Sequence, residues 1–219
     1  MKTLQIILLL LFARMYVEAF IVQQGSREQD AVQALIVHNG EWWGTWHRPE
    51  FCPKGSFANG YSMKIEWDQN GGDDTSLNSI KLRCIFEDGS FAGEVASGQG
   101  PWGTWHSLHI CPSIPGELNL LTSFVLKVEP DQGGGDDTGV SAIKFTCRST
   151  STGSKDIILN NGGDDGPFGY YGSWSESCHP GSFICGLRTK IENEQGNGDD
   201  TALDDIQFYC CNDWALSFK

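Results

Sequence analysis

The sequence predicts an all-β protein, a disulfide-stabilised β-prism of three four-stranded antiparallel sheets with pseudo-threefold symmetry. The first observation is a repeat, because Gly-Asp-Asp-Thr ends at Thr75, Thr138 and Thr201, in two steps of 63 residues. An Ile follows each Thr by five positions and a Cys follows it by nine. A register held over so many positions indicates three copies of one unit. The other observations are a period-two alternation of apolar residues and the scarcity of helix signals among 27 glycines.

Two alternating segments in each unit predict strands. In the first unit, residues 62–67 place Met63, Ile65 and Trp67 on one face, and residues 79–84 place Ile80, Leu82 and Cys84 on one face. Period two is typical of half-buried antiparallel strands. With one strand near a Trp motif and one after each Cys-Pro segment, we expect about four short strands per unit. A short helix over residues 28–36 is a further expectation.

The three units are expected to form one domain. A unit of about 60 residues buries only a marginal core by itself, so three sheets should bury their apolar faces against one another as a three-sided prism. We therefore expect Ile80, Ile143 and Ile206 to occupy equivalent interior positions. The predicted domain covers residues 35–219, with repeats at about 35–90, 91–153 and 154–214.

The N-terminus has the features of an export signal. Lys2 precedes an apolar run from Leu4 to Phe12, and Ala19 ends a small-residue cleavage site. The apolar run is shorter than the roughly 20 residues that span a bilayer. We predict a signal peptide at residues 1–19, a lead segment at residues 20–34, secretion of the protein, and no membrane association.

The chain is strongly acidic. It carries 15 basic and 28 acidic residues, a net charge of −13, and removal of the predicted signal changes the net charge to −14. Such a surface repels phosphate backbones, which excludes nucleic acid as an expected partner. Basic proteins of an extracellular coat are its electrostatic counterparts.

Eight cysteines in an exported chain predict four disulfides rather than a zinc site, because the sequence has no Cys-x-x-Cys pair. Equivalent cysteines in equivalent units should make equivalent bonds, which leaves Cys185 and Cys211 for each other. The predicted pairs are Cys52–Cys84, Cys111–Cys147, Cys178–Cys210 and Cys185–Cys211.

Each unit also contains an aromatic-Gly-Ser/Thr-Trp motif. The three copies are residues 43–46, 102–105 and 171–174. The Trp that ends each copy recurs in every unit, so we expect Trp46, Trp105 and Trp174 in the core. Exposed aromatic rings can stack on sugars, and the better candidates for glycan contact are the tryptophans that do not recur: Trp42, Trp67 and Trp214.

The repeated acidic pairs admit a functional and a structural interpretation. They could be acid/base groups or calcium ligands, but Asp also accepts backbone N–H bonds in tight turns, and three copies of a catalytic pair are not needed. We predict turn-stabilising roles for Asp73, Asp74, Asp136, Asp137, Asp199 and Asp200, with no metal and no cofactor. Asp164 and Asp165 lie outside the repeat register and are expected in another loop.

Other chemical groups give no catalytic pattern. The glutamates of the repeated Lys-aliphatic-Glu segments (Glu66, Glu129, Glu192), and the lysine beside each, are expected on a solvated sheet face. His47 and His106 follow the Trp motif in two units, and Ser175 takes their place in the third. No singled-out nucleophile accompanies them, so no catalytic residue is assigned.

The triplicated Gly-Asp-Asp-Thr, the Trp-Gly-Thr-Trp motif and the eight cysteines together resemble vitelline membrane outer layer protein I and its relatives, from about Leu35 to Trp214. The resemblance implies a secreted β-prism, whose founding member is a component of the outer coat of the egg yolk membrane. A glycan-transferring activity on chito-oligosaccharides has been attributed to that family.

Three functions follow as hypotheses. The favoured one is a non-catalytic structural or interaction protein of an extracellular coat or secretion. The first alternative is a lectin-like module that binds extracellular glycans. The second alternative, which only the resemblance implies, is an enzyme of glycan transfer.

Overall fold

The protein is described by a computed structural model. It covers residues 27–69, 74–112, 116–130, 132–133, 137–151, 155–195 and 200–212. The predicted signal peptide lies outside these residues. No helix in the described part of the chain is long and apolar enough to cross a membrane.

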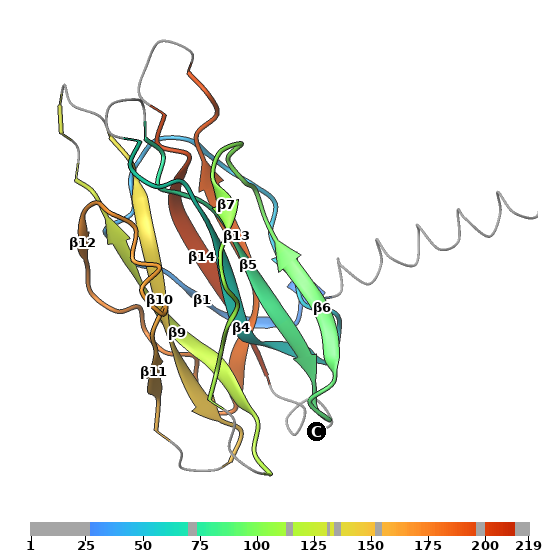
Figure 1. Cartoon of the computed structure of the whole chain (residues 1–219). Coiled ribbons are helices and arrows are strands. Elements are labelled where there is room, and N and C mark those ends of the chain that lie inside the picture. The colour runs from blue at the N-terminus through green and yellow to red at the C-terminus, as the bar shows by residue number, and fades with distance from the viewer. Residues whose placement is uncertain are drawn as a thin grey trace, which may run out of the picture.

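Three antiparallel hairpins of ten-residue strands form the body of the molecule. They are β4 (Ser56–Ile65) with β5 (Leu77–Phe86), β9 (Asn119–Val128) with β10 (Val140–Ser149), and β13 (Ser182–Ile191) with β14 (Leu203–Asn212). Figure 1 shows β9–β10 at the left, β4–β5 at the right, and β13–β14 between them. Strands β4, β9 and β13 contact one another, so the hairpins form the predicted all-β prism.

The expected strand after each Cys-Pro segment and the expected strand at each Lys-aliphatic-Glu are one continuous strand. In the first unit, β4 covers both. The reason is that Phe57 and Ala58, which follow the Cys-Pro segment, are as buried as Met63 and Ile65. The strand therefore has a buried position to fill along its whole length.

A third strand flanks each hairpin on one side. These edge strands are β6 (Phe91–Ala96) beside β5, β11 (Ile157–Leu159) beside β10, and β1 (Ala31–Leu35) beside β14. The expectation of a helix over residues 28–36 is therefore wrong, because the free edge of β14 pairs with residues 31–35 and Leu35 enters the core. Residues 31–34 belong to the prism rather than to the lead segment.

The Trp-motif strands cross to the sheet of the preceding unit. The crossing strands are β7 (Thr104–Trp105) and β8 (His109–Ile110) on β4, β12 (Tyr170–Tyr171) on β9, and β2 (Thr45–Trp46) and β3 (Glu50–Phe51) on β13. The resulting orders are β6-β5-β4-β7, β11-β10-β9-β12 and β1-β14-β13-β2. Because each sheet needs a strand from another unit, the three units form one body.

The core confirms the predicted equivalence of the isoleucines. Ile80, Ile143 and Ile206 are each fully buried. A cluster of rings packs beside them, with Phe124 and Phe208 at 4.7 Å between ring centroids. A second apolar cluster contains Phe57, Leu120 and Phe183 at equivalent repeat positions near the start of β4, β9 and β13.

The disulfides have the pairing that the repeat predicts. Bonds join Cys52 to Cys84, Cys111 to Cys147, Cys178 to Cys210, and Cys185 to Cys211. The first three connect a crossing segment to the second strand of its own unit's hairpin. The fourth lies in the apolar cluster around Phe57 and Phe183.

Candidate functional site

The Gly-Asp-Asp-Thr loops are closed by a hydrogen bond between the Thr and the Glu of the Lys-aliphatic-Glu segment. Thr75 Oγ1 donates to Glu66 Oε2 at 2.8 Å, and the same bond joins Thr138 to Glu129 at 2.9 Å and Thr201 to Glu192 at 2.8 Å. The glutamates are half-buried rather than free on a solvated face. The constant spacing between the Glu and the Thr therefore reflects a hydrogen bond that closes each loop.

The second Asp of each pair accepts a backbone N–H inside its own loop. Asp74 Oδ1 accepts from the N–H of Gln69 at 3.2 Å, Asp137 from Gln132 at 2.7 Å, and Asp200 from Gln195 at 2.6 Å. This is the turn contact that the sequence analysis expects. Asp73, Asp136 and Asp199 lie outside the described residues.

The residues that follow the three threonines meet where the units join. Ser76, Gly139 and Ala202 all have a left-handed backbone, with φ of 50°, 62° and 55°. Ser76 Oγ donates to Ser141 Oγ at 3.1 Å across two units, and a Cβ placed on Gly139 would lie 3.0 Å from the Leu203 carbonyl. The residues directly after the three threonines therefore meet at one end of the prism and join the units.

The repeated lysines also have structural partners rather than solvent. Lys64 Nζ donates to the Gly100 carbonyl at 2.8 Å, and Lys190 Nζ donates to the Glu41 carbonyl at 3.1 Å. Lys127 Nζ reaches the equivalent segment of the next unit, at the Gly166 carbonyl. Each lysine thus ties its sheet to the segment that leads into the crossing strand.

The structure shifts the Trp motif of the third unit by three residues. The glycine that passes over the end of the long strand is Gly44 in the first unit, Gly103 in the second and Gly169 in the third. Tyr171 therefore pairs with Lys127 as Trp105 pairs with Lys64. Gly169 has a φ of 74°, close to the 72° of Gly44 and the 74° of Gly103, so it has the backbone conformation of that crossing.

The same shift corrects the assignment of Ser175. The backbone N–H of His47 and of His106 donates to the preceding unit's sheet, and in the third unit the equivalent N–H belongs to Gly172. Gly172, not Ser175, thus occupies the histidine position. The side chain of Asn39 comes to 2.5 Å from the point where a Cβ of Gly172 would lie, so a histidine at this position would require Asn39 to move.

The recurring tryptophans are not core residues. Trp105 and Trp174 are each 39% exposed, and Trp46 is half-buried. Trp46 and Trp105 lie outside because β2 and β7 cross over the outer edge of a sheet, where cations pack on the rings, such as Lys81 Nζ at 4.7 Å from the Trp105 centroid. Trp174 lies after the end of β12. The expectation of a core role is therefore wrong.

The non-recurring tryptophans that the structure describes lie at the surface. Trp42 is 73% exposed and packs on the ring of Trp43 at 5.1 Å, and Trp67 is 44% exposed. Trp214 lies outside the described residues. Trp67 follows the end of β4, and Trp42 precedes the short strand β2.

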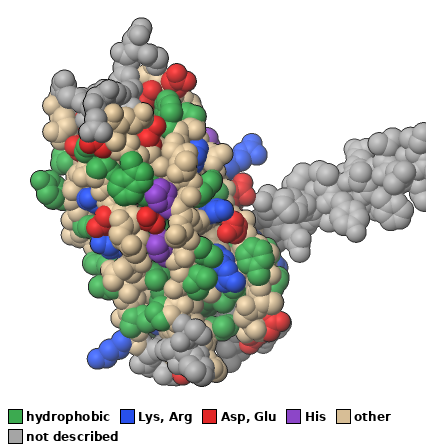
Figure 2. Space-filling model, viewed as in Figure 1, with side chains coloured by type: hydrophobic (Ala, Val, Ile, Leu, Met, Phe, Trp, Pro, Cys, Tyr) green, Lys and Arg blue, Asp and Glu red, His purple; other side chains and the backbone are tan. Residues whose placement is uncertain are grey.

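A hydrogen-bonded chain of side chains holds Trp67. Its indole Nε1–H donates to His106 Nε2 at 3.2 Å, and His106 Nδ1 lies 3.0 Å from Asp164 Oδ1. The second oxygen of Asp164 lies 3.1 Å from His109 Nε2. Since Nε2 of His106 accepts from the indole, its hydrogen is on Nδ1 when the ring is neutral, and it donates to Asp164. Figure 2 shows histidine side chains in the middle of one face, with acidic and hydrophobic side chains around them.

Asp165 extends this cluster on its other side. Burial opposes its charge, but hydrogen bonds from Tyr171 and Asn161 and the nearby Lys144 lower the pKa of Asp165 below its ordinary value. Burial and the bond to Asp165 raise the pKa of Tyr171. The pair that lies outside the repeat register, Asp164 and Asp165, therefore organises a polar surface at this junction.

Asp204 and Asp205 are ionisable residues that the sequence analysis missed. Asp204 is fully buried and neither carboxylate oxygen has a hydrogen-bond partner in the described structure. Burial raises the pKa of Asp204 to about 7 and that of Asp205 to about 6. The repeat register could have found Asp204, because Asn78 and Ser141 take its place in the other units.

These groups support binding more readily than catalysis. The described acidic residues of the repeats are committed to loop closure, and Asp204 is sealed from solvent. Within the described ranges, no group of three or more His, Cys, Asp or Glu side chains is arranged to hold a metal ion. At the surface formed by Trp67, His106 and Asp164, an exposed aromatic ring lies beside polar side chains.

Comparison with solved structures finds lectins with a related outline and little sequence similarity. One is a mannose-binding lectin from Champedak, with a TM-score of 0.43 and 11% identity, covering 83% of this chain and 95% of the lectin. Another is artocarpin in a complex with mannopentose, with a TM-score of 0.41 and 11% identity, covering 80% of this chain and 99% of artocarpin.

Two relatives share much more sequence identity with this chain than these lectins do. The chain is 42% identical to the vitelline membrane outer layer protein 1 homolog of Mus musculus over 177 residues, covering 80% of this chain and 81% of that protein. It is 39% identical to the vitelline membrane outer layer protein 1 homolog of Homo sapiens over 181 residues, which cover 81% of this chain and 82% of that protein. Residues 33–213 match the family model of vitelline membrane outer layer protein I, and the chain therefore belongs to the vitelline membrane outer layer protein I family.

Proposed function

We propose that this protein is a secreted, non-catalytic interaction protein of an extracellular coat or secretion, and that it contacts glycans through the Trp67 surface. That surface is defined here as Trp67, His106, Asp164 and Gln69. The observation that carries the proposal is the exposed indole of Trp67, held in place through its own N–H by His106.

The fixed indole supports sugar contact for two physical reasons. The ring is 44% exposed, so it offers an apolar face on which the C–H groups of a pyranose can stack. The bond to His106, and the bond from His106 to Asp164, hold that face before a ligand arrives. A side chain ordered in advance loses less entropy on binding.

Polar groups beside the indole suit sugar hydroxyls. The exposed Gln69 amide donates to Glu66 Oε1 at 2.7 Å, two residues from Trp67 in the chain. Glycan sites commonly combine an apolar face with a few polar groups that fix orientation. Trp42, 73% exposed at another junction, is a second candidate for contact.

The extracellular setting rests on other observations. Four disulfides are typical of proteins from oxidising compartments. The negative net charge of −13 favours basic partner proteins in a coat and disfavours polyanions. Named relatives in mouse and human carry the outer-layer description.

A glycan array that includes chito-oligosaccharides, probed with the secreted protein, tests the proposal. We expect selective binding, and Trp67→Ala should weaken it by at least about tenfold, or roughly 1.4 kcal/mol. Trp174→Ala is the matched control, because Trp174 is 39% exposed but lies on a different junction. Absence of binding, or equal loss in both variants, would refute the glycan contact. Turnover of the oligosaccharide would instead support an enzyme.

A further inference from the structure

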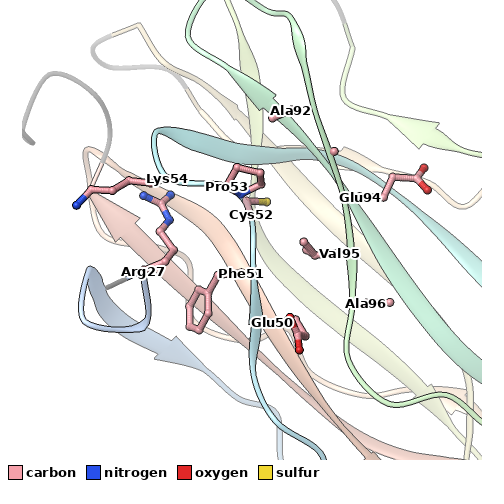
Figure 3. Close-up of a pocket in the computed structure, with 11 residues that line it drawn as sticks. Arg27, Glu50, Phe51, Cys52, Pro53, Lys54, Ala92, Glu94, Val95 and Ala96 are labelled. Atoms are coloured by element: carbon pink, nitrogen blue, oxygen red, sulfur yellow. The ribbon is translucent and has the colours of Figure 1, made fainter. Parts of the chain in front are cut away.

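A cavity of about 380 Å³ lies between the crossing strand β3 and the edge strand β6. It is distinct from the Trp67 surface and shares no residue with it. Phe51, Val95 and the disulfide-bonded Cys52 line its apolar middle, together with the small side chains of Ala92 and Ala96. Figure 3 shows the cavity with the residues that line it.

One residue of the repeat leaves space in this cavity. Gly93 pairs with Cys84 in the first sheet, Ile157 pairs with Cys147 in the second, and Gln33 pairs with Cys210 in the third. Ile157 brings a large side chain to its position, and the Gln33 amide bonds across the groove to the Ser177 carbonyl at 3.2 Å. At Gly93 a Cβ would meet nothing within 4 Å.

The two ends of the cavity differ in charge. Figure 3 places Arg27 and Lys54 side by side at one end, and the two lining carboxylates, Glu50 and Glu94, away from them. Glu94 is already paired with Lys81 Nζ at 2.8 Å. Among the described residues, both cations pair with Asp30, whose carboxylate is 3.7 Å from Arg27 and 3.9 Å from Lys54.

Arg27 is built into this end rather than displayed at the surface. It is 5% exposed, it donates to the Ser56 carbonyl at 2.8 Å, and its guanidinium lies 5.1 Å from the Phe57 ring centroid. Its Nε has no hydrogen-bond partner in the described part of the chain. Its described counter-ion, Asp30, is 36% exposed. Buried charges need pairing and hydrogen bonds, so an anion in the cavity would add compensation for the guanidinium.

We propose that this cavity binds a small amphipathic carboxylate, with its anionic group against Arg27 and Lys54 and its aliphatic or aromatic body between Phe51 and Val95. The volume lies at the small end of the range of about 300–1,000 Å³ that ligand sites occupy. The apolar lining disfavours a sugar, so this ligand class differs from that of the Trp67 surface.

Displacement of the fluorescent anion 1-anilinonaphthalene-8-sulfonate from the mature protein tests the site. The competitors share one chain length and differ in charge: octanoate, octanol and octylammonium. We expect octanoate to bind at least about tenfold more tightly than the other two. Equal displacement by all three, preference for the cation, or no binding of the dye would overturn the proposal.

Variants locate the site. Ala96→Phe should fill the cavity and abolish octanoate binding, whereas Ala34→Phe, in the groove beside β1, should leave it unchanged. Lys54→Met, at a side chain that is 59% exposed, should reduce the preference for the anion to less than about threefold without affecting folding. Unchanged octanoate binding by Ala96→Phe, or an unchanged anion preference in Lys54→Met, would refute this location.

Discussion

The buried carboxyl of Asp204 should make the stability of the protein depend on pH. At the equivalent position, the Asn78 amide donates to Thr75 Oγ1 at 2.6 Å. Thr201 Oγ1 donates its hydrogen to Glu192, so it can only accept from Asp204. An ionised Asp204 has no hydrogen to give, and a protonated one can copy the asparagine. Replacing Asp204 with Asn should therefore stabilise the protein where the aspartate would be charged.

The size of the effect follows from the pKa. Burial raises the pKa of Asp204 from 3.8 to about 7, and each pKa unit corresponds to about 1.4 kcal/mol. The raised folded-state pKa means that the charged form opposes folding. This penalty is absent below about pH 4, grows as pH rises, and is complete above about pH 7, with an upper limit of about 4 kcal/mol.

Thermal unfolding at pH 4 and pH 8 measures the effect. At pH 8, Asp204→Asn should raise the Tm by up to about 8–16 °C, since 1 kcal/mol corresponds to about 2–4 °C in a protein of this size and the upper limit is about 4 kcal/mol. At pH 4 the two proteins should melt together. Asn78→Asp is the reverse control and should lose stability as pH rises. An equal Tm difference at both pH values, or a destabilised Asp204→Asn at pH 8, would refute the reasoning.

Further predictions concern the repeated loops. Asp137→Ala should lower the free energy of unfolding by about 1 kcal/mol, because it removes the acceptor of the Gln132 N–H. Calcium should not change the Tm of the unmodified protein. A calcium-dependent rise in Tm that Asp137→Ala abolishes would indicate a metal site. Thr138→Val should remove the bond to Glu129 and lower the free energy of unfolding by about 1 kcal/mol in urea titration, and an unchanged midpoint would argue against loop closure. Gly139→Ala should lower the free energy of unfolding by about 1–2 kcal/mol, because the residue has a φ of 62° and an added Cβ would lie close to the Leu203 carbonyl. An unchanged Tm would contradict that geometry.

The fold was predictable where the repeat imposed equivalence. The 63-residue register identified three units, the buried Ile80, and the pairing of every cysteine. These features are set by position along the chain, and position is what a repeat preserves. The alternation of apolar residues predicted strands in the hairpins, because side chains on one face of a strand recur at every second residue.

Features that depend on contact between units were not predictable. The crossing of the Trp motif to the preceding sheet put Trp105 at the surface, because recurrence indicates an equivalent environment and not a buried one. The three-residue shift to Gly169 reflects a close approach to Val128, which no spacing in the sequence reveals. A strand at residues 31–35 depends on the free edge of β14.

The candidate site was predictable only in part. Trp67 was singled out because it does not recur, and it is exposed. Its partner Asp164 comes from a loop almost one hundred residues later in the chain, and the bond through His106 depends on the meeting of two junction segments. Asp204 stands out only when the three repeats are compared position by position.

The claim that glycans contact Trp67 is tested most directly by the NMR signal of its indole N–H. Comparison with Trp67→Phe assigns the signal, and a chito-oligosaccharide, or whichever glycan the array selects, is then titrated into the labelled protein. We predict a saturable shift of the Trp67 signal, because the ring lies beside the sugar, while the Trp174 signal stays in place. A glycan that binds without moving the Trp67 signal would contradict the assignment of the site.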